Sequence, residues 1–274
     1  MTAQPRNIAF IGAGNMTQSI VGGMVQNGYP ANYITVSNPS MGKLEHLQQQ
    51  CGVSITQDNN QAVANAEVVV LAVKPQLMAA VCEQLKQSVT NLGDKLIISI
   101  AAGIRLAKYQ QYLAADRIIR VMPNTPSLVG QGMTGLVTQA ATSAADREFA
   151  SSIFDRVGKT LWVDDEDQMD ILSALAGSGP AYFFEFMASL QKAAVALGFN
   201  HQQARILVNQ TALGAATMAT DSELELPDLR AQVTSKGGST AKGIEVYQAA
   251  DVDFISEQAL RAAVKRNQEM AQLF

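Results

Sequence analysis

Short apolar runs rich in β-branched residues alternate with amphipathic segments along the first part of the chain. The runs predicted to form strands are Asn7–Ile11, Tyr33–Val36, Glu67–Val73, Lys95–Ile100, Arg117–Val121, Thr134–Val137 and Leu161–Val163. Glu67–Val73 and Lys95–Ile100 are continuous, as expected of strands buried on both faces of a parallel sheet, and the last two runs are expected near an edge. Because helical segments separate most runs, the pattern predicts an α/β fold with a doubly wound parallel sheet.

After Asp164 the pattern becomes entirely helical. The chain is therefore expected to divide into domain 1–164, which carries the sheet, and an all-α domain 165–274. Pro180 interrupts an apolar helical pattern and predicts a kink there. Too much of that helix is apolar for one small domain to cover, which predicts a subunit interface; a buried core helix is the alternative. The residues concerned are Tyr182, Phe183, Phe184, Phe186 and Met187.

Composition narrows the class of protein further. The chain has 274 residues, 47% of them hydrophobic, and a formal net charge of −4 without any basic block, so nucleic acid is not expected as a partner. Cys51 and Cys82 form no CxxC motif, which argues against a disulfide or zinc framework and favours a reducing cytoplasm. The N-terminus lacks signal-peptide features, and the apolar run Ile171–Phe184 is too short to span a membrane.

A glycine turn, Gly12-Ala13-Gly14, follows the first predicted strand and opens a predicted helix. Gly12 permits the tight turn, Gly14 lets a pyrophosphate approach the backbone, and the helix N-terminus stabilises its charge. Thr17 occupies the position where the dinucleotide fingerprint has Gly or Ala. In this strand–turn–helix context the motif predicts a Rossmann-type dinucleotide site. A tight turn without a ligand is the alternative.

The end of the second predicted strand bears on the choice of nicotinamide cofactor. NAD sites usually have Asp or Glu there to hold the ribose diol. Here the strand runs into Ser37-Asn38-Pro39-Ser40, with Lys43 close behind, so no acid would repel a 2′-phosphate. We therefore expect NADP(H) to be preferred, with NAD(H) possible. The same residues could also cap the next helix.

Six motifs, taken together, resemble those of the pyrroline-5-carboxylate reductase family, whose members catalyse the last step of proline biosynthesis. They occur in the family's order and cover nearly the whole chain. The matching stretches are IGAGNM (Ile11–Met16), AVKP (Ala72–Pro75), SIAAG (Ser99–Gly103), RVMPNTP (Arg120–Pro126), GSGPAY (Gly177–Tyr182) and TSKGGST (Thr234–Thr240). The glycine turn alone is shared by many dehydrogenases, whereas the last three stretches together are far more specific.

The resemblance implies NAD(P)H-dependent reduction of the cyclic imine 1-pyrroline-5-carboxylate to L-proline, in a homodimer or larger homo-oligomer joined through the helical domain. Its cofactor contacts fall on Ile11, Gly12, Ala13, Gly14, Asn15, Met16, Asn38, Ser40, Asn59, Ala72, Val73, Lys74, Pro75, Ala101, Ala102 and Gly103. Its substrate contacts fall on Ser235, Gly237, Gly238, Ser239 and Thr240, with Glu223 nearby. Two positions depart from the family pattern. Thr17 could loosen helix–strand packing, and Lys236 replaces a proline in the substrate loop.

The Gly237-Gly238 stretch can supply what such a substrate needs. Both glycines are expected to leave N–H groups unshielded ahead of a helix beginning near Thr240, and helix N-termini favour anions such as a carboxylate. The Thr240 hydroxyl can hydrogen-bond the ring nitrogen, which makes it the catalytic candidate. A cyclic imine is basic enough to need no strong general acid. Read without the resemblance, the stretch would be a glycine turn with a Ser/Thr cap.

The sequence offers few residues for other catalytic mechanisms, and no metal is expected. The two histidines, His46 and His201, are predicted to be solvated, so neither a Ser-His-Asp nor a metal mechanism is favoured. The acidic run Asp164–Asp167 suits a linker and a helix N-terminus. Lys74, which precedes a proline, is expected to end a strand beside the cofactor.

Two other functions remain open on sequence alone. An NADP-dependent dehydrogenase of the β-hydroxyacid type would use a lysine of the helical domain as acid/base, but Lys192 lies in the polar phase of its helix. A non-catalytic NADP-binding sensor would keep the glycine turn after the first strand and would have no use for Gly237-Gly238. Turnover of an imine substrate separates these possibilities.

Overall fold

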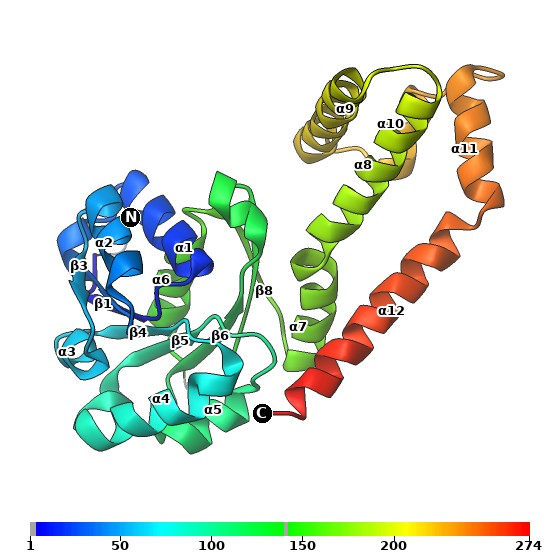
Figure 1. Ribbon diagram of the computed structural model, residues 1–274. Coiled ribbons are helices and arrows are strands. Elements are labelled where there is room, and N and C mark those ends of the chain that lie inside the picture. The colour runs from blue at the N-terminus through cyan, green and yellow to red at the C-terminus, as the bar shows by residue number, and fades with distance from the viewer. Residues whose placement is uncertain (1–3, 140–141) are drawn as a thin grey trace. The chain divides into compact units, whose positions relative to one another are not determined.

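The computed structural model describes residues 4–139 and 142–274 (Figure 1). The chain forms two compact units, which we call unit 1 and unit 2. Unit 1 extends to Gly177 and also includes Ala263–Phe274, and unit 2 is Ser178–Ala262. The boundary expected after Asp164 marks a different feature, because it lies just beyond the last strand, which ends at Trp162.

Unit 1 contains an eight-stranded sheet in the order β3-β2-β1-β4-β5-β6-β7-β8. The strands are β1 (Ile8–Ile11), β2 (Ile34–Ser37), β3 (Ser54–Thr56), β4 (Val68–Leu71), β5 (Leu96–Ser99), β6 (Ile118–Met122), β7 (Gly132–Thr138) and β8 (Gly158–Trp162). All pairings are parallel except that of β6 with β7. The doubly wound sheet predicted from the sequence is thus confirmed. Only β3 was not predicted, because it is a three-residue edge strand with no apolar run.

Helices cover both faces of this sheet (Figure 1). Those of unit 1 are α1 (Asn15–Gln26), α2 (Met41–Cys51), α3 (Asn59–Ala64), α4 (Pro75–Ser88), α5 (Leu106–Leu113), α6 (Ala144–Phe154) and α7 (Glu166–Leu172). Successive strand residues point to opposite faces, so Phe10 packs in the core beneath α1, α2 and α6, whereas Ile11 packs with α3, α4 and α5. Two separate hydrophobic cores result, one on each face.

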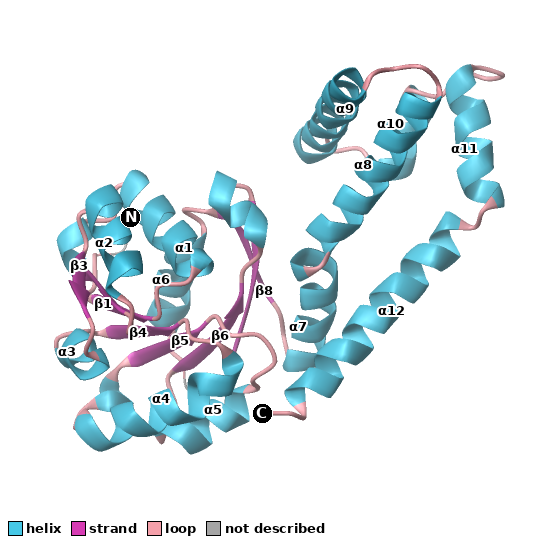
Figure 2. Ribbon diagram, in the orientation of Figure 1, coloured by secondary structure: helices cyan, strands magenta, loops and turns pink. Residues whose placement is uncertain are grey.

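Unit 2 is built from helices alone (Figure 2). They are α8 (Gly179–Ala196), α9 (His201–Asp221), α10 (Leu226–Gln232), α11 (Ser239–Ala249) and the first part of α12 (Val252–Ala271). Pro180 lies in the first turn of α8, where a proline removes no helical hydrogen bond, so the expected kink was wrong. The irregularity lies just before it, in the π-helical turn Ser173–Gly177. Within the described ranges, no helix is long and apolar enough to cross a membrane.

Candidate functional site

The carboxyl ends of four neighbouring strands carry the predicted cofactor residues. Their last residues lie side by side in register: Ile11 pairs with Ser37 on one side and Leu71 on the other, and Leu71 pairs with Ser99. From each of these strands the chain continues into a segment predicted to bind the cofactor. The strand order reverses beside β1, and ligands of open α/β sheets bind at such a switch point.

The turn after β1 packs against the two neighbouring loops. Gly12 donates its N–H to Ser37 O at 2.7 Å, and Ala13 donates its N–H to Asn38 Oδ1 at 3.2 Å. Gly12 has a φ of +111°, and a Cβ there would lie 2.6 Å from the carbonyl oxygen of Ala72. Only glycine fits this position, because both the backbone angle and the close loop exclude a side chain.

The N-terminus of α1 is open to a ligand. Gly14 is its N-cap and contributes no side-chain bond. The first helical bond runs from Gln18 N–H to Gly14 O, and the N–H groups of Asn15 and Met16 have no acceptor in the described part of the chain. Unpaired N–H groups at a helix N-terminus suit a phosphate.

Thr17, which could have loosened the packing of helix on strand, is instead accommodated at the start of α1. Its side chain is buried, and its hydroxyl donates to Gly12 O at 2.8 Å. The larger residue therefore stabilises the glycine turn from within the helix.

The segment after β2 is tied to the glycine turn through amide and hydroxyl groups. Asn38 donates from Nδ2 to Ser40 O at 3.1 Å, while Ser37 Oγ donates to Asn59 Oδ1 at 2.7 Å. Ser40 is the N-cap of α2, but its side chain makes no capping bond. Its hydroxyl is thus available to a ligand, which favours the cofactor interpretation over simple capping.

The segments after β4 and β5 are the other two predicted cofactor segments at the carboxyl ends of these four strands. Lys74 does not end a strand as predicted, because β4 ends at Leu71; it is the exposed N-cap of α4 and is followed by Pro75 in the first helical turn. In the turn Ala101–Gly103, Ala102 is half-buried and Gly103 has a φ of +79°. A Cβ on Gly103 would lie 3.6 Å from the ring of Phe274 and 3.8 Å from Met270 Cβ, so the last turn of α12 and the residues after it pack on this turn.

A charged cluster next to this turn was missed by sequence reasoning. Glu166 accepts from Leu106 N–H, the first of α5, at 3.1 Å and from buried Arg120 at 2.8 Å. Arg105 donates to Asp170 at 2.9 Å. Burial raises the pKa of Asp170, and the two arginines oppose this shift only in part. The acidic run lies at a helix N-terminus as predicted, because Asp165 is the N-cap of α7 and Glu166 is in its first turn, but the bonds that Glu166 accepts could not be foreseen.

In unit 2 the Gly-Gly stretch forms a β-turn. Gly238 N–H donates to Ser235 O at 3.0 Å, Gly237 has a φ of +74°, and Lys236 has no positive φ. These features define a type II turn, which favours Pro at the second position, where Lys236 lies, and Gly at the third. A Cβ on Gly238 would lie 2.4 Å from Ser235 Oγ, so a side chain there would displace the Ser235 hydroxyl.

The sequence predicted free N–H groups on both Gly237 and Gly238, but only the prediction for Gly238 is wrong, since Gly237 N–H has no acceptor recorded within unit 2. Gly238 N–H closes the turn and is not available, whereas the N–H groups of Ser239, Thr240 and Ala241, in the first turn of α11, have no acceptor within unit 2. Thr240 is exposed. Glu223 lies in the exposed segment before α10, and no hydrogen bond joins it to the turn. The N-terminus of α11 is therefore the anion site that unit 2 offers.

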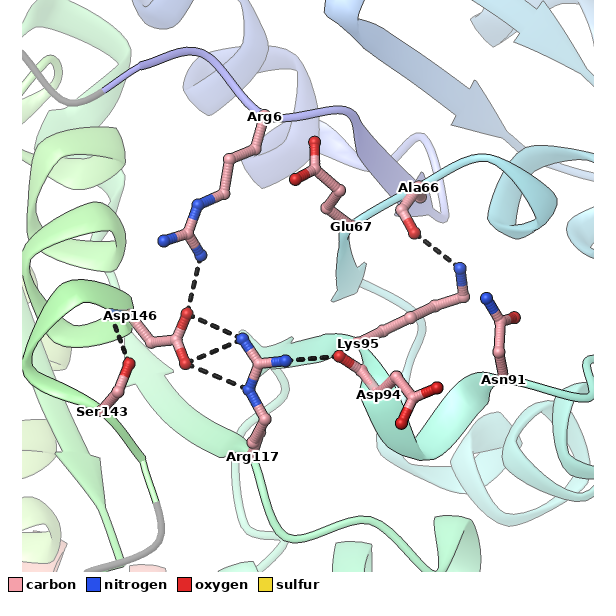
Figure 3. A pocket seen from close by; sticks show the side chains of 9 residues that line it. All are labelled: Arg6, Ala66, Glu67, Asn91, Asp94, Lys95, Arg117, Ser143 and Asp146. Carbon is pink, nitrogen blue, oxygen red and sulfur yellow. Dashed lines mark hydrogen bonds and ion pairs between the residues drawn. The ribbon is translucent and has the colours of Figure 1, made fainter.

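A cavity of about 480 Å³ lies at the opposite edge of the sheet, near the amino ends of the strands (Figure 3). Arg6 and Arg117 both point to the buried carboxylate of Asp146, at 2.7 and 2.9 Å. Lys95 instead donates to Ala66 O at 2.6 Å. Burial raises the pKa of Asp146, but hydrogen bonds from Arg6, Arg117 and the N-cap residue of α6 outweigh it and hold that pKa below its usual range. The charged groups around this cavity pair with one another or with the backbone, so we interpret them as a structural ion network.

Among the described residues, no group of three or more His, Cys, Asp or Glu side chains could hold a metal ion. His46 and His201 are exposed, as predicted. Cys51 and Cys82 are both free.

The sheet order and the glycine turn are those of a Rossmann-type dinucleotide-binding protein. Residues 7–103 match the family described as NADP oxidoreductase, coenzyme F420-dependent, and residues 166–270 match the pyrroline-5-carboxylate reductase dimerisation family. The second match begins close to the boundary expected from sequence.

Similarity to individual proteins extends over the full chain. The pyrroline-5-carboxylate reductase of Vibrio alginolyticus is 47% identical over 98% of this chain and 99% of its own. The structure of the Coxiella burnetii enzyme of that name superposes with a TM-score of 0.94 at 43% identity, covering 98% of this chain and 99% of the other. A Plasmodium falciparum pyrroline carboxylate reductase with NADP bound gives a TM-score of 0.83 at 27% identity, covering 97% and 98%. The chain belongs to the pyrroline-5-carboxylate reductase family.

Proposed function

We propose that this protein uses NAD(P)H to reduce 1-pyrroline-5-carboxylate to L-proline, the final step of proline biosynthesis. The observation that carries the proposal is the type II turn Ser235–Gly238, which opens onto the unpaired N-terminus of α11. An imine acid needs such a carboxylate site, whereas a sensor of the dinucleotide alone would not. A β-hydroxyacid dehydrogenase is not favoured, because no relative reported above is one and Lys192 is exposed.

The loops at the carboxyl edge of unit 1 fit a dinucleotide. Gly12 admits no Cβ, the first N–H groups of α1 are unpaired, and the Ser40 hydroxyl is free. Within this proposal, residues 1–164 form the cofactor domain and residues 165–274 the substrate and dimerisation domain. The residues that would hold the cofactor are Ile11–Met16, Asn38, Ser40, Asn59, Ala72–Pro75 and Ala101–Gly103. When bound, the reduced nicotinamide supplies the hydride.

The substrate carboxylate is held by unit 2. The N–H groups of Ser239, Thr240 and Ala241 donate to it, and the dipole of α11 favours its charge by up to ~2 kcal/mol in a partly buried site. The hydroxyls of Ser235 and Ser239 lie in the same segment and can add further hydrogen bonds. Gly237 and Gly238 shape the turn, and Glu223 is assigned to the rim of the site on the strength of the family resemblance alone.

Thr240 acts at the ring nitrogen. Reduction adds a hydride to the imine carbon and leaves the nitrogen with a proton, so the C=N double bond becomes a C–N single bond. A cyclic imine takes up that proton readily, and the Thr240 hydroxyl orients the nitrogen by a hydrogen bond. The protein's part in the reaction is thus positioning and charge stabilisation.

The protein acts as a homo-oligomer, at least a dimer, joined through unit 2. Helices α10, α11 and α12 have no buried residue in the single chain, and α8 exposes Phe183 and Phe184. A second copy would cover these apolar faces. We place the protein in the cytoplasm, because its two free cysteines suit a reducing compartment.

The activity is tested by mixing the purified protein with NADPH and 1-pyrroline-5-carboxylate and following the nicotinamide absorbance. Loss of absorbance with formation of proline is expected. Absence of turnover, although NADPH binds, would favour a sensor, and turnover of β-hydroxy acids instead would favour the alternative enzyme.

Cofactor preference gives a second test, in which NADPH is expected to have the higher kcat/KM. Asn38→Asp should invert this preference by repelling the 2′-phosphate, while its carboxylate can still accept the Ala13 N–H. Asn38→Ala is the control, because losing the amide without adding charge should weaken the binding of both cofactors alike. Equal kcat/KM for the two cofactors in the unmodified protein would argue against a phosphate site here.

A further inference from the structure

Ser99 and Tyr109 form a buried hydroxyl pair next to the turn Ala101–Gly103. Ser99 is the last residue of β5, Tyr109 lies in the first turn of α5, and both are fully buried. Their oxygens are hydrogen-bonded to each other, and Ser99 Oγ also accepts the N–H of Ala101 at 3.3 Å. The first residue of the turn is thereby tied to the helix that follows it.

The rest of Tyr109 is embedded in the hydrophobic core on this face of the sheet. A phenylalanine would bury the same ring without requiring a partner for a hydroxyl, so the oxygen must be explained by its bond to Ser99. Burial raises the pKa of Tyr109 well above its ordinary value, with the Ser99 hydrogen bond opposing, so the hydroxyl stays protonated at neutral pH. The pair can therefore serve as a permanent tether.

We propose that Tyr109 is a positioning residue for the cofactor, acting through Ser99 to hold the turn Ala101–Gly103 in its binding conformation. This inference rests on the proposed function, in which that turn contacts the cofactor. A turn that is ordered in advance does not have to be ordered on binding, which strengthens affinity without any new contact. Once the cofactor is bound, the turn is held by it as well, so the tether contributes to binding and not to the chemical step.

Tyr109→Phe tests the proposal with full-length protein and NADPH as the probe. We expect the Kd and KM for NADPH to rise about three- to tenfold, the range set by loss of one buried hydrogen bond, while kcat at saturating NADPH stays within about twofold. A Kd equal to that of the unmodified protein would overturn the proposal. So would a fall in kcat without a change in Kd.

Tyr29→Phe is the matched control for simple loss of stability. Tyr29 is also a buried tyrosine, and its hydroxyl accepts from Arg6 N–H at 2.9 Å and donates to Arg6 O at 2.6 Å, at the other edge of the sheet. We expect this variant to lower the melting temperature at least as much as Tyr109→Phe, with no change in the Kd for NADPH. Equal weakening of NADPH binding by both variants would mean that the effect is only structural.

Two further variants separate this inference from the proposed function. Ala102→Asp places a negative charge in the turn and should weaken NADPH binding strongly; if it does not, the turn is no cofactor site and both claims fail. If Ala102→Asp weakens binding but Tyr109→Phe does not, only the positioning role fails. Ser99→Ala should weaken NADPH binding at least as much as Tyr109→Phe, because it also removes the acceptor of the Ala101 N–H, and the double variant should be no worse than Ser99→Ala alone.

Discussion

The two units of this chain are stabilised in different ways. Unit 1 contains two hydrophobic cores, and residues such as Phe10, Ile34 and Val70 are completely buried. Unit 2 consists of long helices, yet in the single chain Phe183 is 71% exposed and Leu197 87% exposed. Apolar surface of this extent is rarely left open on a monomeric protein.

The two units therefore depend on different contacts for their stability. Unit 1 can fold on its own contacts, because its central strands β1, β4 and β5 are completely buried under helices of the same chain. Unit 2 lacks a core of its own, so its helices are stabilised by the surface that a second copy would cover. Substitutions in unit 1 should therefore change folding, and substitutions on the apolar faces of unit 2 should change assembly.

The largest effect is expected from Phe184→Glu on α8. A carboxylate at this exposed apolar position would be buried in the oligomer without a partner, so assembly and activity should be lost together. Light scattering and the NADPH assay measure the two. Lys192→Glu, in the polar phase of the same helix, is the control and should leave the oligomer intact. A Phe184→Glu monomer with full activity would refute the interface.

The next largest effect is expected from Asp146→Asn in unit 1. This substitution leaves Arg6 and Arg117 without their shared carboxylate, and breaking a buried pair costs about 3–5 kcal/mol. We expect the lower end, since both arginines are partly exposed. Asp94→Asn, in the same cavity but in no ion pair that the structure records, is the control. Chemical denaturation should show a lower free energy of unfolding for Asp146→Asn only. Equal stability of both variants would contradict the ion network.

The same carboxylate predicts a pH dependence. The pKa of Asp146 is lowered in the folded protein. Its carboxylate therefore contributes fully to the free energy of unfolding above the unfolded pKa of about 4, and this contribution is lost as pH falls through the lower, folded pKa. The stability difference between the unmodified protein and Asp146→Asn should therefore shrink in strong acid and stay constant at neutral pH.

The contrast between the units also explains what could be predicted from the sequence. In unit 1 the apolar runs indicated seven of the eight strands, and the pattern was clearest for β1, β4 and β5, which are buried on both faces. The bond between Arg120 and Glu166 could not be predicted, since the two are 46 residues apart and nothing in the sequence pairs the motif that contains Arg120 with the acidic run that contains Glu166. The segments after β1, β2, β4 and β5 were identified from motifs, and their adjacency follows from the strand order.

In unit 2 the sequence indicated helices and an excess of apolar surface, but not which groups of the turn are free. Two adjacent glycines do not reveal that Gly238 N–H closes a turn while the next three N–H groups remain unpaired. That distinction depends on the hydrogen bond to Ser235, which appears only when the backbone is in place. Likewise, Pro180 suggested a kink because the sequence did not show where α8 begins.

A smaller effect is expected from Thr240→Val in the first turn of α11. The variant loses one hydrogen bond to the reacting nitrogen and keeps the helix, so kcat should fall by less than the ~10²–10³ that follows loss of an oxyanion donor. The Kd for NADPH and the oligomeric state should not change. Thr240→Ser retains the hydroxyl and should restore most of the rate. An unchanged kcat in Thr240→Val would remove this residue from the mechanism.

The smallest effect is expected from Lys236→Pro. Lys236 is exposed and occupies the second position of a type II turn, which proline favours, and its N–H makes no hydrogen bond recorded within unit 2. Proline should therefore fit and stiffen the turn, with a gain of about 0.4–1 kcal/mol from the restricted unfolded chain. We expect the KM for the imine acid to be equal or slightly lower, with little dependence on salt.

Lys236→Ala distinguishes stiffness from charge, because it removes the ammonium group without fixing φ. If the lysine turned toward the substrate carboxylate, both variants would raise KM, and the KM of the unmodified protein would rise with ionic strength as the charge is screened. If the side chain stays in solvent, Lys236→Ala should leave KM unchanged and only the proline variant should lower it. Measuring KM for all three proteins at low and high salt thus shows whether this turn, which no core of unit 2 supports, is limited by its flexibility or assisted by its charge.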